Sequence, residues 1–269
     1  MTTPTATLLA GIPALNNTLY RRLRFSVGDP TALVEITQPD GSTHATLILR
    51  DIEMHRAKQH ARADDVTCPA DFKPAGGLSG DRETATAQAA AECLRRAGVS
   101  QVTGDRTLPL IYAHQAREAG IEVVCDIELG VLERRAKDEE EIAALHKAQQ
   151  ATEDAMRMAC EMVAHAEAAA DGVLHVDGAP LTSERVKTAI DIWLLERRFD
   201  NPESIVAAGP LCADCHNRGT GNLLTRQSVI IDIFPQDKQT RYNGDCTRTV
   251  VNGDIPDELL QMQDRKSVV

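Results

Sequence analysis

Apolar and polar positions in the first half of the chain alternate between strand-like and helix-like stretches. Two short apolar runs, residues 32–36 and 45–49, flank turn-forming residues 38–41 and predict a β-hairpin. An alanine-rich helix is predicted over residues 82–97, and it ends at Gly98, a favourable C-terminal cap. The alternation then continues through strand 99–102, helix 110–119 and strand 121–125. This rhythm predicts a small α/β domain over residues 1–130.

The pattern changes near residue 131. The basic segment Arg134-Arg135-Ala136-Lys137 leads into four consecutive acidic residues, 138–141. Acidic side chains in a first turn favour the positive end of the helix dipole, and Asp138 is suited to cap it. A long helix is therefore predicted over residues 138–170, and a second one follows at residues 182–197. We place the domain boundary here, with a second domain over residues 131–269.

Strand-like segments dominate the last third of the chain, at residues 204–208, 228–233 and 242–251. Asp232 ends a strand that is otherwise apolar, and Asp245 lies within residues 242–251, the predicted hairpin partner. A hairpin would bring both carboxylates to the same end of a sheet, where paired carboxylates suit divalent cations. The simpler alternative is that each aspartate only caps a turn.

Charge and composition narrow the classes of partner. Acidic residues exceed basic ones by 40 to 29, giving a net charge of −11, which argues against nucleic acid and anionic membranes as main partners. The first 19 residues do not resemble a signal peptide, and no apolar run approaches the roughly 20 residues that span a bilayer. Seven scattered cysteines fit reduced thiols. A cytoplasmic protein is expected.

Four consecutive motifs carry a family resemblance. They are Ile205-Val206-Ala207-Ala208-Gly209-Pro210, Ala213-Asp214-Cys215-His216-Asn217-Arg218-Gly219-Thr220-Gly221, Ile230-Ile231-Asp232 and Tyr242-Asn243-Gly244-Asp245-Cys246-Thr247-Arg248-Thr249. In this order they resemble the M24 metallopeptidases, which include Xaa-Pro aminopeptidases, prolidases, methionine aminopeptidases and creatinase. The resemblance implies an α/β creatinase-like N-terminal domain over residues 1–130. It also implies an α+β pita-bread catalytic domain over residues 131–269, incomplete at its C-terminus.

The same resemblance implies a chemistry. By position, Asp232 and Asp245 match the first two metal ligands of the family, and His216 matches a histidine that contacts the substrate. The expected activity is that of a metallo-aminopeptidase of the Xaa-Pro type, which hydrolyses an N-terminal peptide bond with a metal-activated water. Two divalent ions are implied, with Mn²⁺ favoured by the oxygen-rich ligands and Co²⁺ or Zn²⁺ as alternatives. Thr247 and Thr249 would either support Asp245 or lie on an exposed strand face.

Two features depart from the family pattern. Phe234 stands where members usually have glycine, and the turn over residues 235–241 is two residues longer, an even insertion that keeps both aspartates on one face. The family's remaining ligands are one His and two Glu downstream. The 24 residues after Asp245 hold no histidine and one glutamate, Glu258. We therefore expect a fragment of a longer protein, inactive as it stands.

Several alternatives stay open at this stage. A non-catalytic binding module would explain the incomplete ligands, and a creatinase-like hydrolase would share the fold. The Cys212-Ala213-Asp214-Cys215-His216 segment has the haem-attachment spacing, but it lies inside the family motif and no export signal accompanies it. A peptide substrate is the expected partner, and a homodimer is left open. A half-built sheet would also expose edges that favour aggregation.

Overall fold

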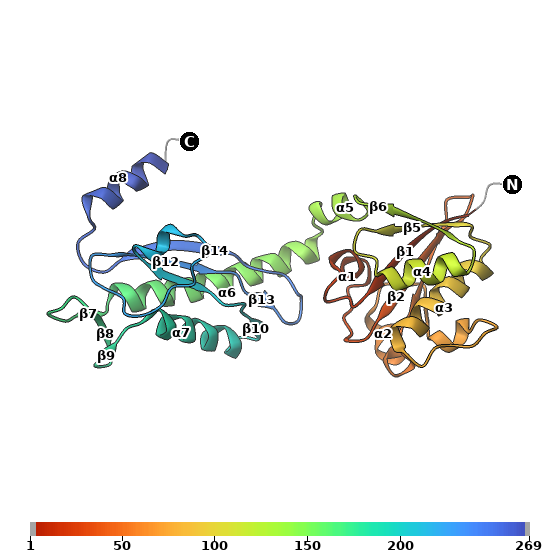
Figure 1. The fold of residues 1–269 in the computed structure, drawn as a ribbon, viewed down its shortest axis with the longest axis horizontal. Coiled ribbons are helices and arrows are strands. Elements are labelled where there is room, and N and C mark those ends of the chain that lie inside the picture. The colour runs from red at the N-terminus through yellow and green to blue at the C-terminus, as the bar shows by residue number, and fades with distance from the viewer. Residues whose placement is uncertain (1–3, 267–269) are drawn as a thin grey trace. The chain divides into compact units, whose positions relative to one another are not determined.

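The computed structural model describes residues 4–266, and the chain forms two compact units, Met1–Lys137 and Asp138–Val269 (Figure 1). The sequence places a boundary near residue 131, whereas the units divide after helix α5 (Val131–Arg135). Helix α5 lies with the first unit because Glu133 pairs with Arg22 of helix α1 at 2.8 Å. Residues 136–138, which follow this helix, therefore join the two units.

Unit 1 is built on a mixed six-stranded sheet in the order β4-β3-β2-β1-β5-β6. The strands are β1 (Thr5–Gly11), β2 (Thr31–Thr37), β3 (Thr43–Ile48), β4 (Asp65–Thr67), β5 (Gln101–Asp105) and β6 (Glu122–Asp126). The helices are α1 (Asn17–Leu23), α2 (Met54–His60), α3 (Arg82–Arg96), α4 (Leu110–Glu118) and α5, with 3₁₀ turns η1 (Asp51–Glu53) and η2 (Pro69–Phe72). The predicted hairpin is confirmed as the β2–β3 pair, and the predicted helices are α3 and α4.

Helices cover both faces of this sheet. Strand β1 pairs antiparallel with β2 and parallel with β5, so it is a central strand. Its side chains alternate, and they place Leu8 in the cluster under α3 and α4 and Leu9 in the cluster under α1 and α2. Both leucines are fully buried, which explains the unbroken apolar run that they share.

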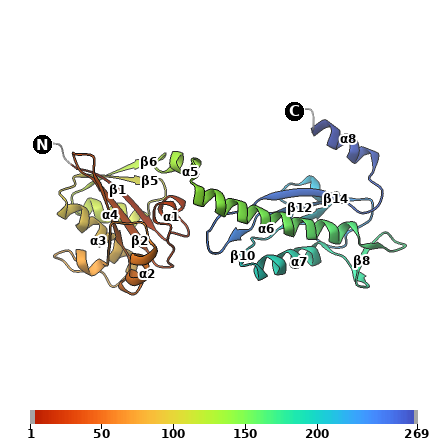
Figure 2. The same ribbon diagram turned by 180° about the vertical axis from the view of Figure 1, so that it is seen from behind.

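Unit 2 packs helices against one face of a three-stranded sheet in the order β11-β12-β14 (Figure 2). Its helices are α6 (Glu139–Ala164), α7 (Ser183–Glu196) and α8 (Asp257–Lys266), with the 3₁₀ turn η3 (Leu211–Ala213). Its strands are β7 (Glu167–Ala168), β8 (Leu174–Val176), β9 (Ala179–Pro180), β10 (Phe199–Asp200), β11 (Ile205–Ala208), β12 (Ser228–Ile233), β13 (Gln236–Asp237) and β14 (Cys246–Val251). Within residues 4–266, no helix combines the length and apolarity that crossing a membrane requires.

The two long helices of unit 2 begin where their caps predict. Asp138 and Glu141 form a reciprocal capping box at the start of α6, and Thr182 accepts from the backbone N–H of Arg185 at the start of α7. Helix α6 ends at Ala164, six residues before the predicted end. The side chain of Asn252, which follows β14, caps this end of the helix. Its Nδ2 donates to the carbonyl oxygens of Val163, Ala164 and Ala166.

The predicted turn between the two aspartate-bearing strands is longer than expected. The strands do pair antiparallel, but β14 begins at Cys246 rather than at residue 242. Between them, β13 leaves this sheet and pairs with β10, and the buried Asp237 carboxylate forms a 2.6 Å ion pair with Lys147 of α6. The predicted pairing of these strands is therefore confirmed, but their connection is longer than predicted, because two partners distant in sequence hold residues 236–237 away from the sheet.

Candidate metal centre

Asp232 lies on the face of the three-stranded sheet that the long helices leave open. Along β12, Val229, Ile231 and Ile233 point into the core shared with α6 and α7. Because strand side chains alternate, Asp232 projects from the opposite face, where it is partly exposed. An aspartate in this apolar strand therefore avoids the cost of burial, and its carboxylate is accessible to a ligand.

Thr247 forms a hydrogen bond with this carboxylate. It stands directly opposite Asp232 in the register of β12 and β14, and its hydroxyl donates to Asp232 Oδ1 at 2.6 Å. Directly opposed residues of antiparallel strands share a face, so the contact follows from the register. A hydroxyl donor of this kind holds a carboxylate in one orientation, as an outer-shell partner of a metal ligand does.

Asp245 immediately precedes β14 and is exposed. It lies two residues before Thr247, so the alternation assigns it to the face of Asp232. Helix α6 fixes its backbone: Gln149 Oε1 accepts from the Asp245 N–H at 3.1 Å. Gly244 makes this approach possible, because a Cβ there would lie 2.0 Å from Thr152 Oγ1 and 2.6 Å from the Ala148 carbonyl oxygen.

Both carboxylates lie near one buried thiol. Burial raises the pKa of Cys246, and the negative charges of Glu153, Asp245 and Asp232 add to the rise, while Arg248 opposes it. Cys246 points into the core, whereas the next residue, Thr247, lies on the open face of the sheet. A surface hollow of about 510 Å³ adjoins Asp245 and is lined in addition by Phe234, Gln236 and residues 200–202.

Asp232 and Asp245 have the ligand type that a divalent metal requires, but not the ligand number. Two carboxylates on one accessible face, one of them oriented by a hydroxyl, are the oxygen ligands that hard and borderline divalent ions prefer. The number of ligands is smaller than such a site needs. Among the side chains that the structure describes, residues 4–263, no three of the His, Cys, Asp or Glu type converge in a way that could hold a metal. Asp232 and Asp245 thus fit the role of partial ligands.

His216 lies in the exposed segment between β11 and β12. Its backbone N–H donates to Asp214 Oδ1 at 3.0 Å, and its side chain is exposed. Among the residues that the structure describes, the hydrogen bonds of Asp232 and Asp245 lead to Thr247 and Gln149 and do not reach this histidine. The structure places the histidine in the same unit as the two aspartates, and its role in contacting a substrate stays a prediction.

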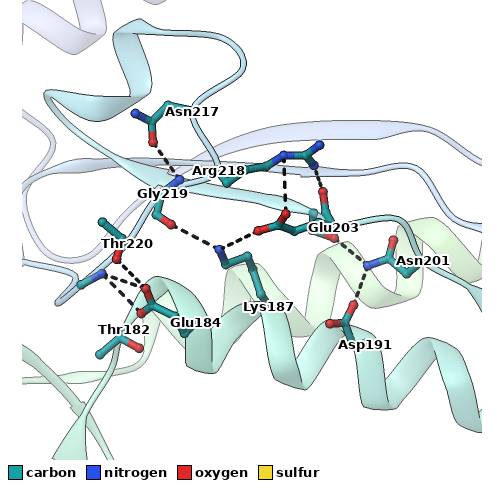
Figure 3. Close-up of polar contacts among 12 residues, drawn as sticks. Thr182, Glu184, Lys187, Asp191, Asn201, Glu203, Asn217, Arg218, Gly219 and Thr220 are labelled. Carbon is teal, nitrogen blue, oxygen red and sulfur yellow. Dashed lines mark hydrogen bonds and ion pairs between the residues drawn. The ribbon is translucent and has the colours of Figure 1, made fainter.

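A polar network directly after His216 has no counterpart in the sequence-based expectations (Figure 3). Glu184, in the first turn of α7, accepts from the Thr220 hydroxyl at 2.7 Å and from the Gly221 N–H at 3.2 Å. Lys187, one turn later, donates to the Gly219 carbonyl oxygen at 3.2 Å. The two glycines of Arg218-Gly219-Thr220-Gly221 indicate a tightly packed segment, but its hydrogen-bond partners come from helix α7, which is distant in sequence.

Glu184 supports a prediction about acid stability. The hydrogen bond from Thr220, with others from the backbone, lowers the pKa of Glu184 from 4.5 to about 2. A lowered folded-state pKa stabilises the protein above about pH 4.5, and this contribution is lost as the pH falls towards 2. Glu184→Gln should therefore destabilise unit 2 at pH 6 and progressively less towards pH 2. Urea unfolding followed by fluorescence of Trp193, the chain's one tryptophan, would measure this.

Glu196→Gln, at the other end of α7, makes the same chemical change outside the network and serves as the control. A wild-type minus Glu184→Gln difference that stays constant between pH 5 and pH 2 would contradict the assignment.

A protein-family comparison identifies the unit that holds these residues. Residues 143–266 match the model of metallopeptidase family M24. Over these residues the chain is similar to the M24 family. It contains Asp232, Asp245 and His216, so the motifs that carry the resemblance lie inside the matched M24 region.

Solved structures extend the likeness to both units. The chain resembles an Xaa-Pro dipeptidase from Bacillus anthracis with a TM-score of 0.73 and 17% identity, covering 97% of this chain and 64% of that one. It resembles a prolidase from Pyrococcus furiosus (TM-score 0.68, 18% identity, 96% and 65% coverage) and an X-Pro aminopeptidase from Thermotoga maritima (TM-score 0.71, 13% identity, 96% and 66% coverage). No curated protein sequence matches the chain.

These comparisons establish the fold that was expected for both domains. The α/β unit followed by an M24 unit has the arrangement of prolidases and aminopeptidase P-like proteins, that is, the creatinase-like pita-bread fold. The chain spans about two thirds of the length of these structures, 64–66% in the three cases above.

Proposed function

We propose that this chain carries the first two metal ligands of a metal-dependent aminopeptidase or dipeptidase of the Xaa-Pro type. The observation that supports this most is the register inside the M24 segment, which places Asp232 opposite Thr247, two residues after Asp245. If Asp232 had a purely structural role, its side chain would be expected to cap the turn at the end of its strand. Its carboxylate instead accepts a hydrogen bond from Thr247 on the neighbouring strand.

Each residue has a role in this proposal. Asp232 and Asp245 would hold one or two divalent ions, which when bound supply an activated water and polarise the scissile carbonyl. Thr247 would keep the Asp232 carboxylate in its binding orientation. His216, exposed on its loop, would donate a hydrogen bond to the carbonyl oxygen of a peptide as negative charge develops there.

The finer points of the proposal follow from the chemistry of the ligands. Manganese is the proposed metal, since both available ligands are carboxylates, with Co²⁺ and Zn²⁺ as alternatives. The proposed substrate is a peptide with proline in its second position. A cytoplasmic location is proposed because all seven cysteines are free thiols, as is usual in a reducing compartment.

Metal titration of the chain tests the proposal. Mn²⁺ binding, followed by calorimetry or by electron paramagnetic resonance, should weaken about 100-fold or more in Asp232→Asn and about 10-fold in Thr247→Val. Asp254→Asn removes the same charge from an exposed position beyond β14 and should bind like wild type. Equal affinities in Asp232→Asn and Asp254→Asn would rule out the assigned ligands. Hydrolysis of Ala-Pro by this chain, with Asp232→Asn as the reference, tests whether the residues present support any activity by themselves.

A second candidate is a non-catalytic module that keeps the pita-bread fold. It is favoured by the small ligand set, since no three metal-binding side chains converge within the described residues 4–263. Binding of Xaa-Pro peptides with an affinity that Mn²⁺ and Asp232→Asn leave unchanged would support this module over the metallopeptidase. A creatinase-like hydrolase would be distinguished by turnover that does not depend on added metal.

A further inference from the structure

Five consecutive residues after His216 are each held in place. Asn217 Oδ1 accepts from the Gly219 N–H at 2.9 Å, and the Arg218 carbonyl oxygen accepts from the Val206 N–H of β11 at 3.2 Å. The arginine side chain also donates to the backbone of Glu203. The Gly221 carbonyl oxygen accepts from the Ser183 N–H at 2.9 Å. We call residues 217–221 the anchor segment.

Two charged residues of α7 bind the middle of the anchor segment (Figure 3). Glu184 takes the Thr220 hydroxyl and the Gly221 N–H, and Lys187 donates to the Gly219 carbonyl oxygen. Lys187 Nζ also lies 3.6 Å from the Glu203 carboxylate, and its side chain is only 14% exposed. A largely buried ammonium with two oxygen partners is fixed more tightly than a surface lysine, because little solvent competes for it.

Close packing removes the remaining freedom of the anchor segment. Gly219 has φ +73°, and a Cβ at this residue would lie 1.8 Å from the Val206 carbonyl oxygen. The backbone of the segment therefore lies directly on β11. Positions 213–216, directly before the anchor segment, are all exposed.

The polar pair on α7 is not needed to attach this helix to the unit. Val186, Ile190 and Leu194 are fully buried in the core of unit 2 and supply that attachment. Glu184 and Lys187 project from another side of the helix towards the anchor segment (Figure 3). What they add is a fixed position for the backbone that directly follows His216.

We propose that Glu184 and Lys187 are positioning residues for His216, acting through the anchor segment. This inference rests on the proposed function, in which His216 contacts the peptide. Neither residue touches a substrate in this proposal. They hold the C-terminal end of an exposed loop on a rigid helix, so that the imidazole occupies a restricted region of space. Restricting a reacting group in this way contributes to catalysis by orientation.

The test uses the full chain with ¹³C-labelled histidine. The eight histidines give separate ring resonances, and His216→Gln identifies the one that belongs to His216. In Lys187→Met, which removes the charge at nearly constant length, the His216 resonance should shift and broaden. Lys187→Arg keeps a donor for the Gly219 carbonyl and should restore it. Lys58→Met removes the same charge from an exposed site in unit 1 and should leave the resonance unchanged.

An unshifted His216 resonance in folded Lys187→Met would overturn the inference. If Lys187→Met loses the spectrum of a folded unit 2, Glu184→Gln is the milder variant, since it keeps an acceptor oxygen while losing the charge. It should shift the same resonance, and failure to do so would also overturn the inference. Titration with Ala-Pro separates the two proposals. If the His216 resonance of the wild type does not shift when Ala-Pro is added, the result counts against the proposed function. The spectra without peptide still decide the role of Lys187.

Discussion

Gly219→Ala is expected to lower the free energy of unfolding of unit 2 by about 3 kcal/mol, through left-handed backbone strain and overpacking together. The methyl group would meet the carbonyl oxygen of Val206 at 1.8 Å, and neither atom is on a flexible side chain. Relief requires the anchor segment to move off β11, which breaks the hydrogen bond between Arg218 and Val206. Urea unfolding followed by Trp193 fluorescence measures the loss, because this tryptophan lies on α7 in unit 2.

Gly221→Ala is the matched control for this substitution. Gly221 has φ +79°, nearly the same backbone conformation, but nothing lies within 4 Å of its ideal Cβ. It should therefore cost about 1 kcal/mol, the strain alone. Equal losses in the two variants would show that the close approach to β11 contributes nothing. The comparison isolates packing from conformation at two positions separated by one residue.

Asn252→Asp is expected to destabilise unit 2 by a similar or larger amount, about 3 kcal/mol or more, because a buried donor is replaced by a buried charge. The Asn252 amide nitrogen donates to three carbonyls at the end of α6, at 2.9–3.1 Å. A carboxylate donates to none of them, and its negative charge faces the negative end of the helix dipole. The same unfolding measurement applies.

Asn222→Asp supplies the control, since it introduces the same charge at an exposed residue of the same unit. Only the buried site should also respond to pH. Protonation of the introduced carboxyl group would remove its charge and return one hydrogen-bond donor, so the loss of stability in Asn252→Asp should shrink at low pH. A deficit that does not change with pH would mean that the lost hydrogen bonds, and not the charge, are responsible.

Elements with strong local signals could be predicted from the sequence. Helix α6 begins at Asp138 because the cap and its reciprocal glutamate lie within one turn of each other. The β2–β3 hairpin is similarly local, since its turn residues lie between the strands they join. The outward direction of Asp232 could also be predicted, because the period of two along β12 separates it from the core residues Ile231 and Ile233.

Features that depend on distant partners could not be predicted. Strand β13 pairs with β10, which lies far before it in the sequence. This pairing makes the connection between β12 and β14 longer than the predicted turn. Glu184 and Lys187 gain their importance from contact with residues 219–221, which no periodicity within α7 reveals. Strand β1 gives only a weak signal, because a segment with two adjacent leucines has neither a strict alternation nor clear flanking turn signals.

The central place of β1 has a consequence for how unit 1 is made. One edge of β1 is covered early, by β2, which is the next strand along the chain. The other edge waits for β5, where Ala6 pairs with Val102, so roughly 100 residues must be joined into a loop before this parallel pairing forms. During synthesis, an apolar strand edge therefore stays open while most of the unit emerges from the ribosome. Nascent chains of this length offer a template for strand addition, and chaperone protection is needed most in that interval.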